Sequence, residues 1–528
     1  MMRVLRAFMT SCQRVMGACS IAAASLRRTS QLVFFLLFVL LMAHSKSHGT
    51  SGAGVGLVQP VNFFFRLDPL TALVNLLADH QLFRGVAWSL VILIPTFFLG
   101  RFFCGWICPL GSLNQCLGSI RSQSRARKAL IASNRYKKWQ ATKYGLLTAG
   151  LLAALFGSSI VGWIDPFSLF VRSIGVSILP AAASKKYYVV YQPHYWPSVI
   201  MGGVFLTLLA MNLRVTRFWC RALCPLGALL GMASRWSILG LHKNAATCNK
   251  CSRCLIHCQG GDDPIGGVSW HKAECHLCLN CVEACPHGSL AFGFSGEIQS
   301  QPEVVGTSLS RRKALAALAT GLAVVPILRA QTALGKSCKE RLIRPPGALN
   351  EADFLSRCIR CGECVRVCPN HALQSAFTEA GLAGLWSPVV MPKIGYCEPG
   401  CVLCSEVCPT GAIQELTARQ KGWVEARGAP STPTLIGTAV YDRRLCLPWA
   451  KATDCVVCLE WCPVEPKAIY VKNAIVVDAN GSPQSLKQPH VDLSRCVGCG
   501  ACEFSCPLEE HPGVYVTSSG ESRLRFSS

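Results

Sequence analysis

Four strongly apolar stretches divide the first half of the chain, at about residues 32–44, 85–103, 144–163 and 198–213. The last three are close to the ~20 residues that a bilayer-spanning helix needs. The first reads LVFFLLFVLLMA after two arginines. It is short enough to be the core of a signal peptide, although we favour an uncleaved helix. The pattern predicts a membrane domain of four helices.

The loops between these stretches differ in charge, and this difference predicts the orientation of the helices. Residues 1–31 carry five arginines and no acidic residue, and residues 104–143 carry eight basic residues and no acidic residue. Residues 44–84 and 164–197 are nearly balanced. Because loops rich in Lys and Arg stay in the cytoplasm, both ends of the four-helix unit are expected there, with the balanced loops outside.

The same half of the chain contains an internal repeat. Residues 101–113 read RFFCGWICPLGSL and residues 217–229 read RFWCRALCPLGAL, with eight of thirteen positions identical. An Asp-Pro dipeptide precedes each copy, beginning at Asp68 in one and at Asp165 in the other. We therefore expect two duplicated helix pairs. The four apolar stretches hold one histidine, His44 at the very end of the first, so a bis-histidine haem between the helices is not expected.

The net charge of +24 is confined to the hydrophobic part of the chain. Residues 1–337 hold 33 Lys and Arg against 9 Asp and Glu, whereas residues 338–528 hold 19 of each. Basic cytoplasmic loops explain this distribution. We therefore expect no nucleic-acid partner, since a basic patch is the only feature in favour of one.

Cysteine is the most unusual component of the sequence, with 32 Cys among 528 residues. In a long chain, grouped cysteines indicate metal binding rather than a disulfide scaffold. Three sets have the spacing C-x2-C-x2-C-x3-C-P: Cys275, Cys278, Cys281 and Cys285; Cys358, Cys361, Cys364 and Cys368; and Cys496, Cys499, Cys502 and Cys506.

This spacing is the one that holds [4Fe–4S] clusters in bacterial ferredoxins. Three thiolates face one cluster, and the fourth cysteine, followed by proline, ligates the other cluster of a pair. Proline suits the point where the loop leaves the site, because its φ is fixed and it has no N–H to satisfy. Zinc sites use two separate Cys pairs and need neither the third cysteine nor the proline.

Three further sets depart from the spacing but still offer four thiols each. They are Cys248, Cys251, Cys254 and Cys258, where Gln259 replaces the proline; Cys397, Cys401, Cys404 and Cys408, with one extra residue at the start; and Cys446, Cys455, Cys458 and Cys462, with a longer first gap. All 24 cysteines are predicted to ligate about six [4Fe–4S] clusters. Arg253, His257 and His276 lie between ligands and are expected to be solvated loop residues.

The two-cluster rule predicts how the first two sets pair. Cys258 and Cys285 would exchange places, so that each completes the cluster of the other set. For the four later sets, pairing between neighbours and nested pairing both remain open. Short β-type segments such as residues 468–479 lie between the cysteine loops.

The C-x3-C-P motifs of the repeat add four more cysteines: Cys104, Cys108, Cys220 and Cys224. If the duplicated helix pairs face each other, these thiols could meet as an extra redox site. The alternative is a structural motif whose cysteines only pack. Cys12, Cys19, Cys116 and Cys338 have no partners by spacing, and free cysteine commonly behaves as a small hydrophobe.

A Ser-Arg-Arg-Lys sequence at residues 310–313 precedes the apolar run ALAALATGLAVVPIL. It resembles a twin-arginine export signal placed within the chain, although Ala314 stands where a Phe is usual. The alternative is a buried helix, because 15 apolar residues are short for a span. Export by the twin-arginine route would suit the cysteine sets that follow this segment. Clusters are built in the cytoplasm, and this route carries folded proteins.

The fold class expected from these patterns is multidomain, with an α-helical membrane domain joined to α+β domains of the bacterial ferredoxin type. The expected divisions are residues 1–240 for the four-helix membrane domain, 241–295 for a two-cluster ferredoxin domain, 296–337 for the linker with the twin-arginine-like segment, and 338–528 for a four-cluster domain.

The order of these parts resembles two known families joined in one chain. Residues 1–290 resemble the NapH family, the membrane ferredoxin-type subunits of periplasmic nitrate reductase systems, and residues 307–528 resemble the NapG family of exported four-cluster subunits. The resemblance implies a multi-pass protein of the cytoplasmic membrane, with its first ferredoxin domain in the cytoplasm and its C-terminal domain in the periplasm.

The function implied by the resemblance is a quinol dehydrogenase module. It would pass electrons from the quinol pool through [4Fe–4S] clusters to a periplasmic terminal reductase or small cytochrome, of nitrate reductase type. The sequence has no catalytic constellation of its own, so substrate reduction would occur on the partner. An alternative is a membrane polyferredoxin for assembly or redox maintenance of a metalloenzyme, since similar modules occur in oxidase and nitrous-oxide reductase accessory proteins. A membrane redox sensor is a third hypothesis, although no signalling domain is visible.

Overall fold

A computed structural model describes most of the chain. The described residues are 25–42, 62–79, 86–122, 126–180, 196–244, 246–261, 271–294, 319, 341–423, 433–477, 483–508 and 510–523. The twin-arginine-like sequence and three of the unassigned cysteines, Cys12, Cys19 and Cys338, lie outside these residues.

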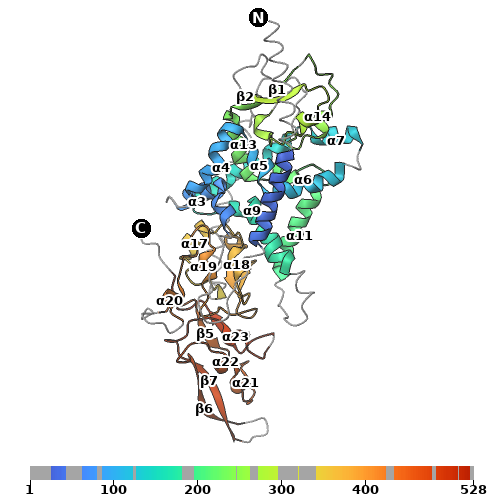
Figure 1. Cartoon of the computed structure of the whole chain (residues 1–528). Helices are drawn as coiled ribbons and strands as arrows, with labels where there is room; N and C mark the ends of the chain where they lie inside the picture. Colours follow the sequence, from blue (N-terminus) through green and yellow to red (C-terminus); the bar gives the residue numbers. More distant parts are fainter. Residues whose placement is uncertain are drawn as a thin grey trace.

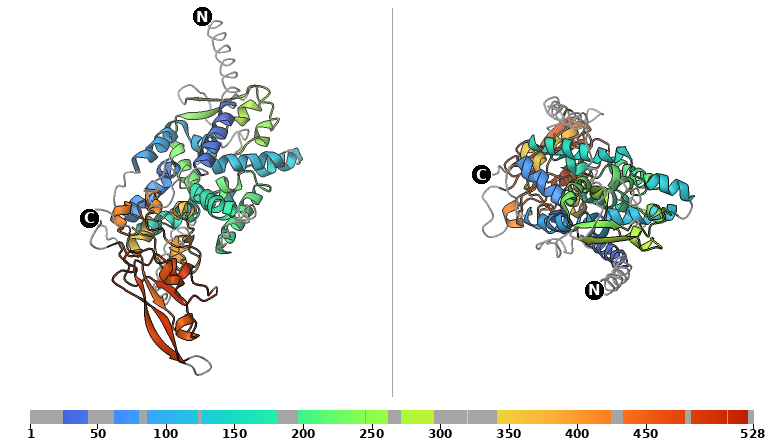
Figure 2. Two further views of the ribbon diagram at one scale, coloured as in Figure 1. Left: turned by 60° about the horizontal axis from the view of Figure 1, so that its bottom comes forward. Right: turned by 90° about the horizontal axis from the view of Figure 1, so that it is seen from above.

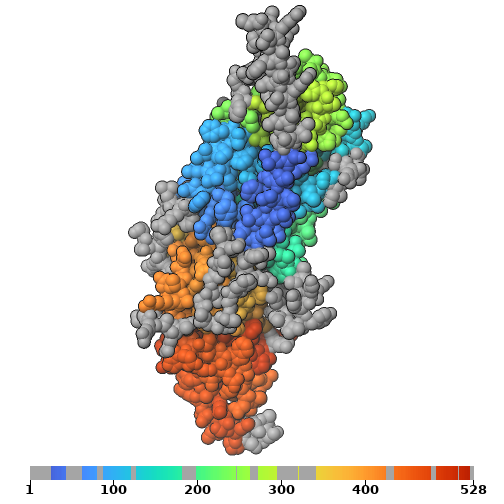
Figure 3. Space-filling model, in the orientation of Figure 1, coloured from blue at the N-terminus to red at the C-terminus, as the bar shows by residue number. Residues whose placement is uncertain are grey.

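Three parts of the molecule follow one another along a long axis (Figure 1). A small sheet with α14 lies at one end, the helices of the first 240 residues form the middle, and the C-terminal domain lies at the other end. The turned views show the same elongated arrangement (Figure 2). In the space-filling view, the dark blue helix Ser25–Met42 lies on the surface of the middle part (Figure 3).

The middle part is entirely helical in the described residues. Beside the helix Ser25–Met42, its α-helices are α2 Phe63–Arg66, α3 Pro69–Asp79, α4 Val86–Leu99, α5 Phe102–Trp106, α6 Pro109–Ser122, α7 Arg127–Asn134, α8 Thr142–Leu155, α9 Pro166–Phe170, α11 Trp196–Met211, α12 Phe218–Ala222 and α13 Pro225–Ala233. Short 3-10 segments are η1 Lys138–Ala141, η2 Ile160–Trp163 and η4 Ser234–Trp236, and η3 Val171–Ile178 is a π-helix.

The sequence repeat corresponds to a repeat of elements. In each copy an Asp-Pro dipeptide opens a helix (α3 or α9), and a longer apolar helix follows (α4 or α11). A five-residue helix then carries the first cysteine of the motif (α5 or α12), and the second cysteine immediately precedes the proline that begins the next helix (α6 or α13). Proline suits that first helical position, because its missing N–H would have no intrahelical partner there.

The apolar helices are shorter than the sequence pattern predicts. Only Ser25–Met42 is both long and apolar enough to cross a membrane by itself, among the residues described. The stretch 85–103 does not form one helix, because α4 ends at Leu99 and Gly100 has a φ of +95°. The 14 residues of α4 extend about 21 Å at 1.5 Å per residue, less than the ~30 Å of a hydrocarbon core. The stretch 144–163 is likewise divided between α8 and η2.

Much of the middle part's outer surface is apolar. Twenty-seven of the 34 large hydrophobic side chains that are exposed among the described residues belong to residues 26–238. They include Val33, Val91 and Ile200, which are 60%, 56% and 48% exposed on three different helices. Exposed apolar side chains that gather on one part of a protein are typical of surfaces that contact another protein, a ligand or a membrane.

Inside, aromatic rings join the first helix to both repeats. Phe38 of the helix Ser25–Met42 makes edge contacts with Phe64 at 5.0 Å and with Phe170 at 5.1 Å between ring centroids. Phe167 lies against Phe64 at 5.8 Å. Such pairs add about 0.5–1.5 kcal/mol each beyond the area they bury. The first helix is thus packed into the unit rather than apposed to it.

The two Asp-Pro aspartates meet where the repeats meet. Oδ2 of Asp165 accepts hydrogen bonds from the N–H groups of Phe167 at 3.0 Å and Ser168 at 2.9 Å, and Oδ1 of Asp68 accepts from Leu70 at 3.0 Å. Each therefore caps its helix. Both carboxyl groups are buried within hydrogen-bonding reach of each other. Two carboxylates so close cannot both ionise readily, so the pair is expected to share a proton.

A small ferredoxin domain follows the helical unit. It contains β1 Leu239–Lys243, α14 Arg253–Ile256, η5 Lys272–Glu274, α15 Asn280–Glu283 and β2 Leu290–Phe294. The strands β1 and β2 are antiparallel, with Leu239 opposite Phe294 and Lys243 opposite Leu290. Both cysteine sets lie between β1 and β2 in sequence. The sheet brings the two ends of the domain together.

The C-terminal domain consists of short helices and two-stranded antiparallel sheets. Its helices are α17 Glu351–Arg357, α18 Glu363–Val367, η7 Leu382–Gly384, α19 Leu403–Glu406, α20 Ala418–Lys421, α21 Leu447–Ala450, α22 Val457–Glu460 and α23 Ala501–Phe504. Its strands are β3 Leu373–Ser375, β4 Pro388–Val390, β5 Thr438–Tyr441, β6 Ile469–Val477, β7 Pro483–Val491 and β8 Val514–Thr517. They pair as β3–β4, β5–β8 and β6–β7, and β6 lies within the predicted segment 468–479.

The aspartate pair makes a prediction about stability. Asp165→Ala removes the cap and leaves two buried N–H groups without an acceptor, so we expect a loss of about 1–2 kcal/mol. Asp165→Asn should lose less than half as much, because its amide can still cap and can donate to Asp68. Thermal unfolding of the detergent-solubilised protein measures both. Equal losses would show that the two side chains do not share a hydrogen bond.

Candidate metal centres

The four sets with regular C-x2-C-x2-C spacing share one backbone conformation. In each set the residues on both sides of the second cysteine have left-handed φ values: Lys250 and Ser252, Leu277 and Leu279, Arg360 and Gly362, and Gly498 and Gly500. Left-handed φ is uncommon outside glycine and marks a functional constraint. Here it curls the loop so that a short helix, carrying the third cysteine, starts directly after the second. The two sets with insertions lack this pair: Val402 and Val456 have φ values near −130°.

In the first ferredoxin domain the structure groups the cysteines across the two sets. Cys248, Cys251, Cys254 and Cys285 line one pocket. Cys281 lies within electrostatic range of Cys275, Cys278 and Cys258. This is the exchange of fourth cysteines that the two-cluster rule predicts.

In the C-terminal domain the structure selects pairing between neighbouring sets. Two of the four groups line pockets: Cys446, Cys455, Cys458 and Cys506 in one, and Cys462, Cys496, Cys499 and Cys502 in the other. The remaining thiols interact as Cys358, Cys361 and Cys364 with Cys408, and as Cys397, Cys401 and Cys404 with Cys368. Each pair of sets therefore exchanges its fourth cysteine, and the nested alternative does not occur.

These pockets suit thiolates that are bound to a cluster. Burial raises the pKa of the Cys254 thiol to about 11 and that of Cys499 to about 12, so the free thiols would stay protonated at neutral pH. Iron supplies the positive charge that makes buried thiolate stable. Backbone N–H groups also point at sulfur, from Gly513 to Cys506 at 3.3 Å. The donor set of each group, four thiols with N–H donors around them, fits a [4Fe–4S] cluster.

The spacing of the thiols separates these groups from mononuclear metal sites. Among the described residues, no group of three or more His, Cys, Asp or Glu side chains is placed so that it could hold a single metal ion. In a [4Fe–4S] cluster each of the four ligands binds a different iron at a corner of the cube, whereas the four ligands of a zinc site bind one ion.

Two polar side chains that the sequence pattern did not single out reach ligand sulfurs from outside the cysteine loops. Lys421 is fully buried, with Nζ 3.4 Å from Sγ of Cys397 and 2.9 Å from the carbonyl oxygen of Cys401. It ends α20, whose Thr417 caps the other end through the N–H of Gln420. The hydroxyl of Tyr441 lies 3.1 Å from Sγ of Cys458. Both come from outside the cysteine loops, so spacing could not reveal them.

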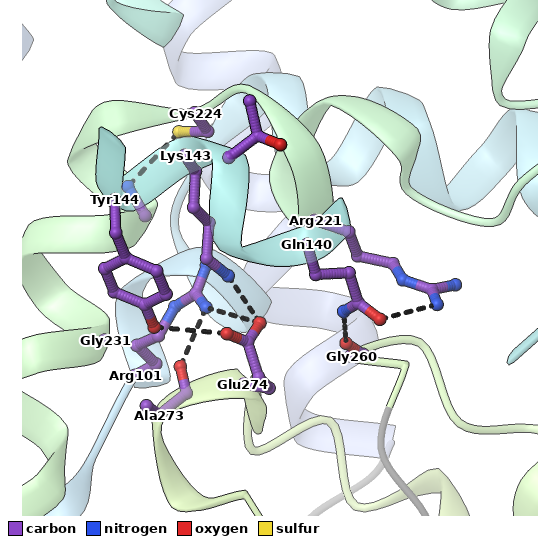
Figure 4. A network of polar contacts seen from close by, with 12 residues as sticks. Arg101, Gln140, Lys143, Tyr144, Arg221, Cys224, Gly231, Gly260, Ala273 and Glu274 are labelled. Atoms are coloured by element: carbon purple, nitrogen blue, oxygen red, sulfur yellow. Dashed lines mark hydrogen bonds and ion pairs between the residues drawn. The ribbon is translucent and has the colours of Figure 1, made fainter. Parts of the chain in front are cut away.

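The first ferredoxin domain is fixed to the helical unit by a buried polar network (Figure 4). Glu274 pairs with Lys143 and accepts a hydrogen bond from the Tyr144 hydroxyl at 3.1 Å. Arg101, at the start of the first C-x3-C-P motif, donates to the carbonyl oxygen of Ala273 at 3.0 Å. All these charged groups are fully or almost fully buried, so removal of one partner would leave an unpaired buried charge.

One of the three residues expected to be solvated is instead part of this interface. Arg253 and His257 are exposed, but His276 is 1% exposed. Burial, together with the cations Arg101 and Arg217, holds the pKa of His276 well below its usual value. The prediction was wrong for His276 because the interface covers it, and a side chain added at Gly105 would overlap its carbonyl oxygen.

The C-terminal domain contacts the opposite end of the helical unit. Arg357 forms a two-point ion pair with Asp79 of α3, at 3.0 and 2.6 Å. Arg360, next to Cys361, donates to the carbonyl oxygen of Ser159 at 2.5 Å. The guanidinium of Arg172 donates to the carbonyl oxygen of Arg360 at 3.1 Å. Consequently the cluster group that contains Cys361 lies directly against the helical unit.

The four cysteines of the repeat meet inside the helical unit. Cys104, Cys108, Cys220 and Cys224 are 5–7% exposed and belong to one apolar core. The thiols of Cys108 and Cys224 lie within electrostatic range of Cys104 and Cys220. Cys116, which spacing left without a role, is exposed on α6.

Comparison with known proteins supports the interpretation of the cysteines. Three domain families, each described as a 4Fe-4S binding domain, match the chain: one at residues 81–128, 194–243 and 402–426, one at 354–374 and one at 487–508. No solved structure matches the chain.

Curated relatives are ferredoxin-type proteins. The chain is 34% identical to the ferredoxin-type protein NapG of Escherichia coli over 209 residues, which are 38% of this chain and 80% of NapG. It is 35% identical to the methylamine utilization ferredoxin-type protein MauM of Methylobacillus flagellatus over 175 residues, 32% of this chain and 65% of MauM. Protein NirI of Paracoccus denitrificans is 29% identical over 199 residues, 37% of this chain and 26% of NirI.

Together with the cysteine pockets, these matches define a class of protein: a ferredoxin-type iron–sulfur protein with several [4Fe–4S]-binding groups. Within that class, the chain belongs to the ferredoxin-type family that includes NapG and MauM. It spans about two thirds of the length of the MauM relative from Methylobacillus flagellatus.

The exchange of fourth cysteines predicts which Cys→Ser substitutions alter the same cluster. Cys285→Ser should alter the same cluster as Cys248→Ser, although Cys285 belongs to the other set in sequence. Cys258→Ser should alter the same cluster as Cys275→Ser. Electron paramagnetic resonance spectra of the four variants, reduced under identical conditions, make the comparison. The grouping is wrong if the Cys285 variant instead matches the Cys275 variant.

Lys421 predicts a shift in one cluster potential. Lys421→Met removes a buried positive charge beside Cys397, which should favour the oxidised cluster and lower its potential by an amount on the order of tens of millivolts. A redox titration followed by paramagnetic resonance measures the shift. Arg419→Met, on the exposed side of the same helix, is the matched control and should move the potential much less. An equal shift in both variants would rule out a local effect.

Proposed function

We propose that the protein is a membrane-bound electron-transfer subunit that passes electrons from the quinol pool to a periplasmic reductase or small cytochrome. Its six ferredoxin-type cysteine groups would hold six [4Fe–4S] clusters, two on the cytoplasmic side and four in the periplasm. The observation that carries the proposal is the placement of the two ferredoxin domains at opposite ends of a helical unit with apolar sides.

The apolar surface supports a membrane location for the helical unit. The exposed hydrophobic side chains of Ser25–Met42, α4 and α11 would be costly in water at this density. Only the first of these helices is long enough to span alone. The shorter helices would cross as stacked pairs, with the buried backbone break at Gly100 shielded by protein.

Charge supports the orientation. Arg27 and Arg28 begin the helix Ser25–Met42 and contact Asn280 and Glu283 of the first ferredoxin domain. Arg127 and Lys128, which begin α7, lie at the same end, where α7 contacts α14. Loops rich in Lys and Arg remain cytoplasmic. The first ferredoxin domain would therefore be cytoplasmic, and the domain at the other end periplasmic.

The path of the chain supports export of the C-terminal domain. The first ferredoxin domain ends at Phe294 and the described C-terminal domain begins at Arg341, and the two domains lie at opposite ends of the helical unit (Figure 1). The residues between them include the twin-arginine-like sequence at 310–313. In this orientation, those residues connect the two sides of the membrane, as a mid-chain export signal would require.

Quinol is the proposed donor because the apolar outer surface of the helical unit would place the protein beside the lipid-soluble quinol pool. The cluster group containing Cys361 is the closest of the C-terminal domain to the helical unit, through Arg360 and Arg172. Electrons from a quinol at that level would enter there and move outward through the three following groups. A role in assembly of a metalloenzyme is the second candidate, favoured by the buried C-x3-C-P thiols.

The proposed topology predicts the result of limited proteolysis. Protease added to spheroplasts should digest the C-terminal domain and spare the first ferredoxin domain, whereas in inverted vesicles the first ferredoxin domain should be digested and the C-terminal domain spared. Antibodies against each domain would detect the fragments. Protection of the C-terminal domain in intact spheroplasts would contradict the export of that domain.

The proposed donor predicts cluster reduction in isolated membranes. A reduced menaquinone or ubiquinone analogue should bleach the visible absorbance of the clusters within the time of enzymatic turnover. Arg360→Met leaves the ligands intact but disturbs the contact between Cys361 and the helical unit, and should slow the reduction at least tenfold. Arg495 is exposed beside Cys496 and lies far from that contact, so Arg495→Met should not slow the reduction. No bleaching by either quinol would favour the assembly role.

A further inference from the structure

The four C-x3-C-P cysteines are arranged as a cluster site rather than as packing residues. We infer that Cys104, Cys108, Cys220 and Cys224 together ligate one additional [4Fe–4S] cluster, held between the two repeats beneath the first ferredoxin domain. Each repeat contributes two ligands, one from its five-residue helix and one from the residue before its proline.

Each motif directs N–H donors at its own sulfur. The N–H of Gly111 lies 3.4 Å from Sγ of Cys108, and the N–H of Gly227 lies 3.2 Å from Sγ of Cys224. The two contacts are equivalent positions of the repeat. The side-chain amide of Asn114 adds a third donor, 3.8 Å from Sγ of Cys220. Hydrogen bonds to sulfur are characteristic of cluster ligands, whose charge they stabilise.

The charge around these thiols requires an anion. Arg101, Arg217 and Lys143 are fully buried near the cysteines, but Glu274 is the only buried carboxylate of the described residues that pairs with any of them. Arg217 donates instead to the carbonyl oxygen of Cys104 at 3.1 Å. Buried cations without counter-charge are strongly unfavourable. Four thiolates around a cluster carry net negative charge and would balance the two cations that Glu274 leaves over.

Several buried arginines of the described residues have an unpartnered Nε, but Arg101 alone among them also has an unpartnered terminal nitrogen. Nε and Nη2 of Arg101 and Nε of Arg217 are buried without a hydrogen-bond partner. Nη2 of Arg101 lies beside the turn at Gly227, so close that a Cβ there would approach it to 2.6 Å. That turn also holds Cys224. Buried N–H groups without partners are rare in folded proteins, and cluster sulfide between the four thiols would be an acceptor for them.

A single metal ion or a purely structural role for the four cysteines explains fewer of these observations than a cluster does. No three of these thiols are placed to hold one ion, and in this respect they match the ferredoxin-type groups. Cysteines that only pack would not require the buried guanidinium groups. The site therefore takes an iron–sulfur cluster rather than zinc or copper.

The location of the additional cluster suits a role in electron transfer. This role rests on the proposed function. Above it, the indole N–H of Trp106, between two of the cysteines in sequence, donates to the carbonyl oxygen of Leu277 at 3.0 Å, next to Cys278. Below it, the apolar core that contains the four cysteines also contains Cys361 of the C-terminal domain. The additional cluster thus lies between the two ferredoxin domains and would connect them across the membrane.

The experiment counts iron and acid-labile sulfide in the full-length protein purified without oxygen. Seven clusters require about 28 of each, and six require about 24. Cys104→Ser and Cys224→Ser should each lose about four iron and one paramagnetic signal, with the ferredoxin signals unchanged. Cys116→Ser, on α6 but in no group, is the control and should lose none.

Three results would overturn the inference: a wild-type count of about 24, unchanged iron in the two variants, or alkylation and mass spectrometry that find these cysteines joined as disulfides. If the variants fold poorly, the wild-type count alone still decides. Quinol reduction of the same preparations separates the two proposals. A protein with seven clusters that no quinol reduces would retain the additional site and refute the proposed donor.

Discussion

The exchange of the fourth cysteine between paired sets is the constraint on which the rest of the structure depends. No set in this chain can complete a cluster alone in the described grouping, because its fourth thiol faces the neighbouring one. Two loops must therefore fold against each other for either to bind iron. The short helices and two-stranded sheets have little core of their own, so the metal groups supply much of the reason for this fold.

The same principle extends into the helical unit in a different form. There the two partners are copies of one sequence motif, and the repeat places Cys108 and Cys224 in equivalent turns. The Asp68 and Asp165 side chains meet by the same relation at the other end. Duplication thus brings equivalent residues together across the boundary between the repeats. Thiols meet at one end of the helical unit, and carboxyl groups meet at the other end.

Sequence reasoning succeeded where chemistry is local. Cysteine spacing predicted the ferredoxin-type domains, the repeat and the exchange of Cys258 with Cys285, because ligand geometry restricts the chain over a few residues. It failed where residues far apart in sequence meet. Lys421 reaches Cys397 from another helix, and His276 is buried only because the helical unit covers it. Helix lengths were overestimated for a related reason, since hydropathy does not register the break at Gly100.

The contact between Arg357 and Asp79 joins two parts of the chain that resemble two separate families. A covalent connection makes such an encounter unimolecular, at effective concentrations that reach the millimolar range for short flexible connections. The interface can then remain occupied at any expression level. Stoichiometry between the two halves is also fixed at one to one, which two independently produced subunits would have to achieve by regulation.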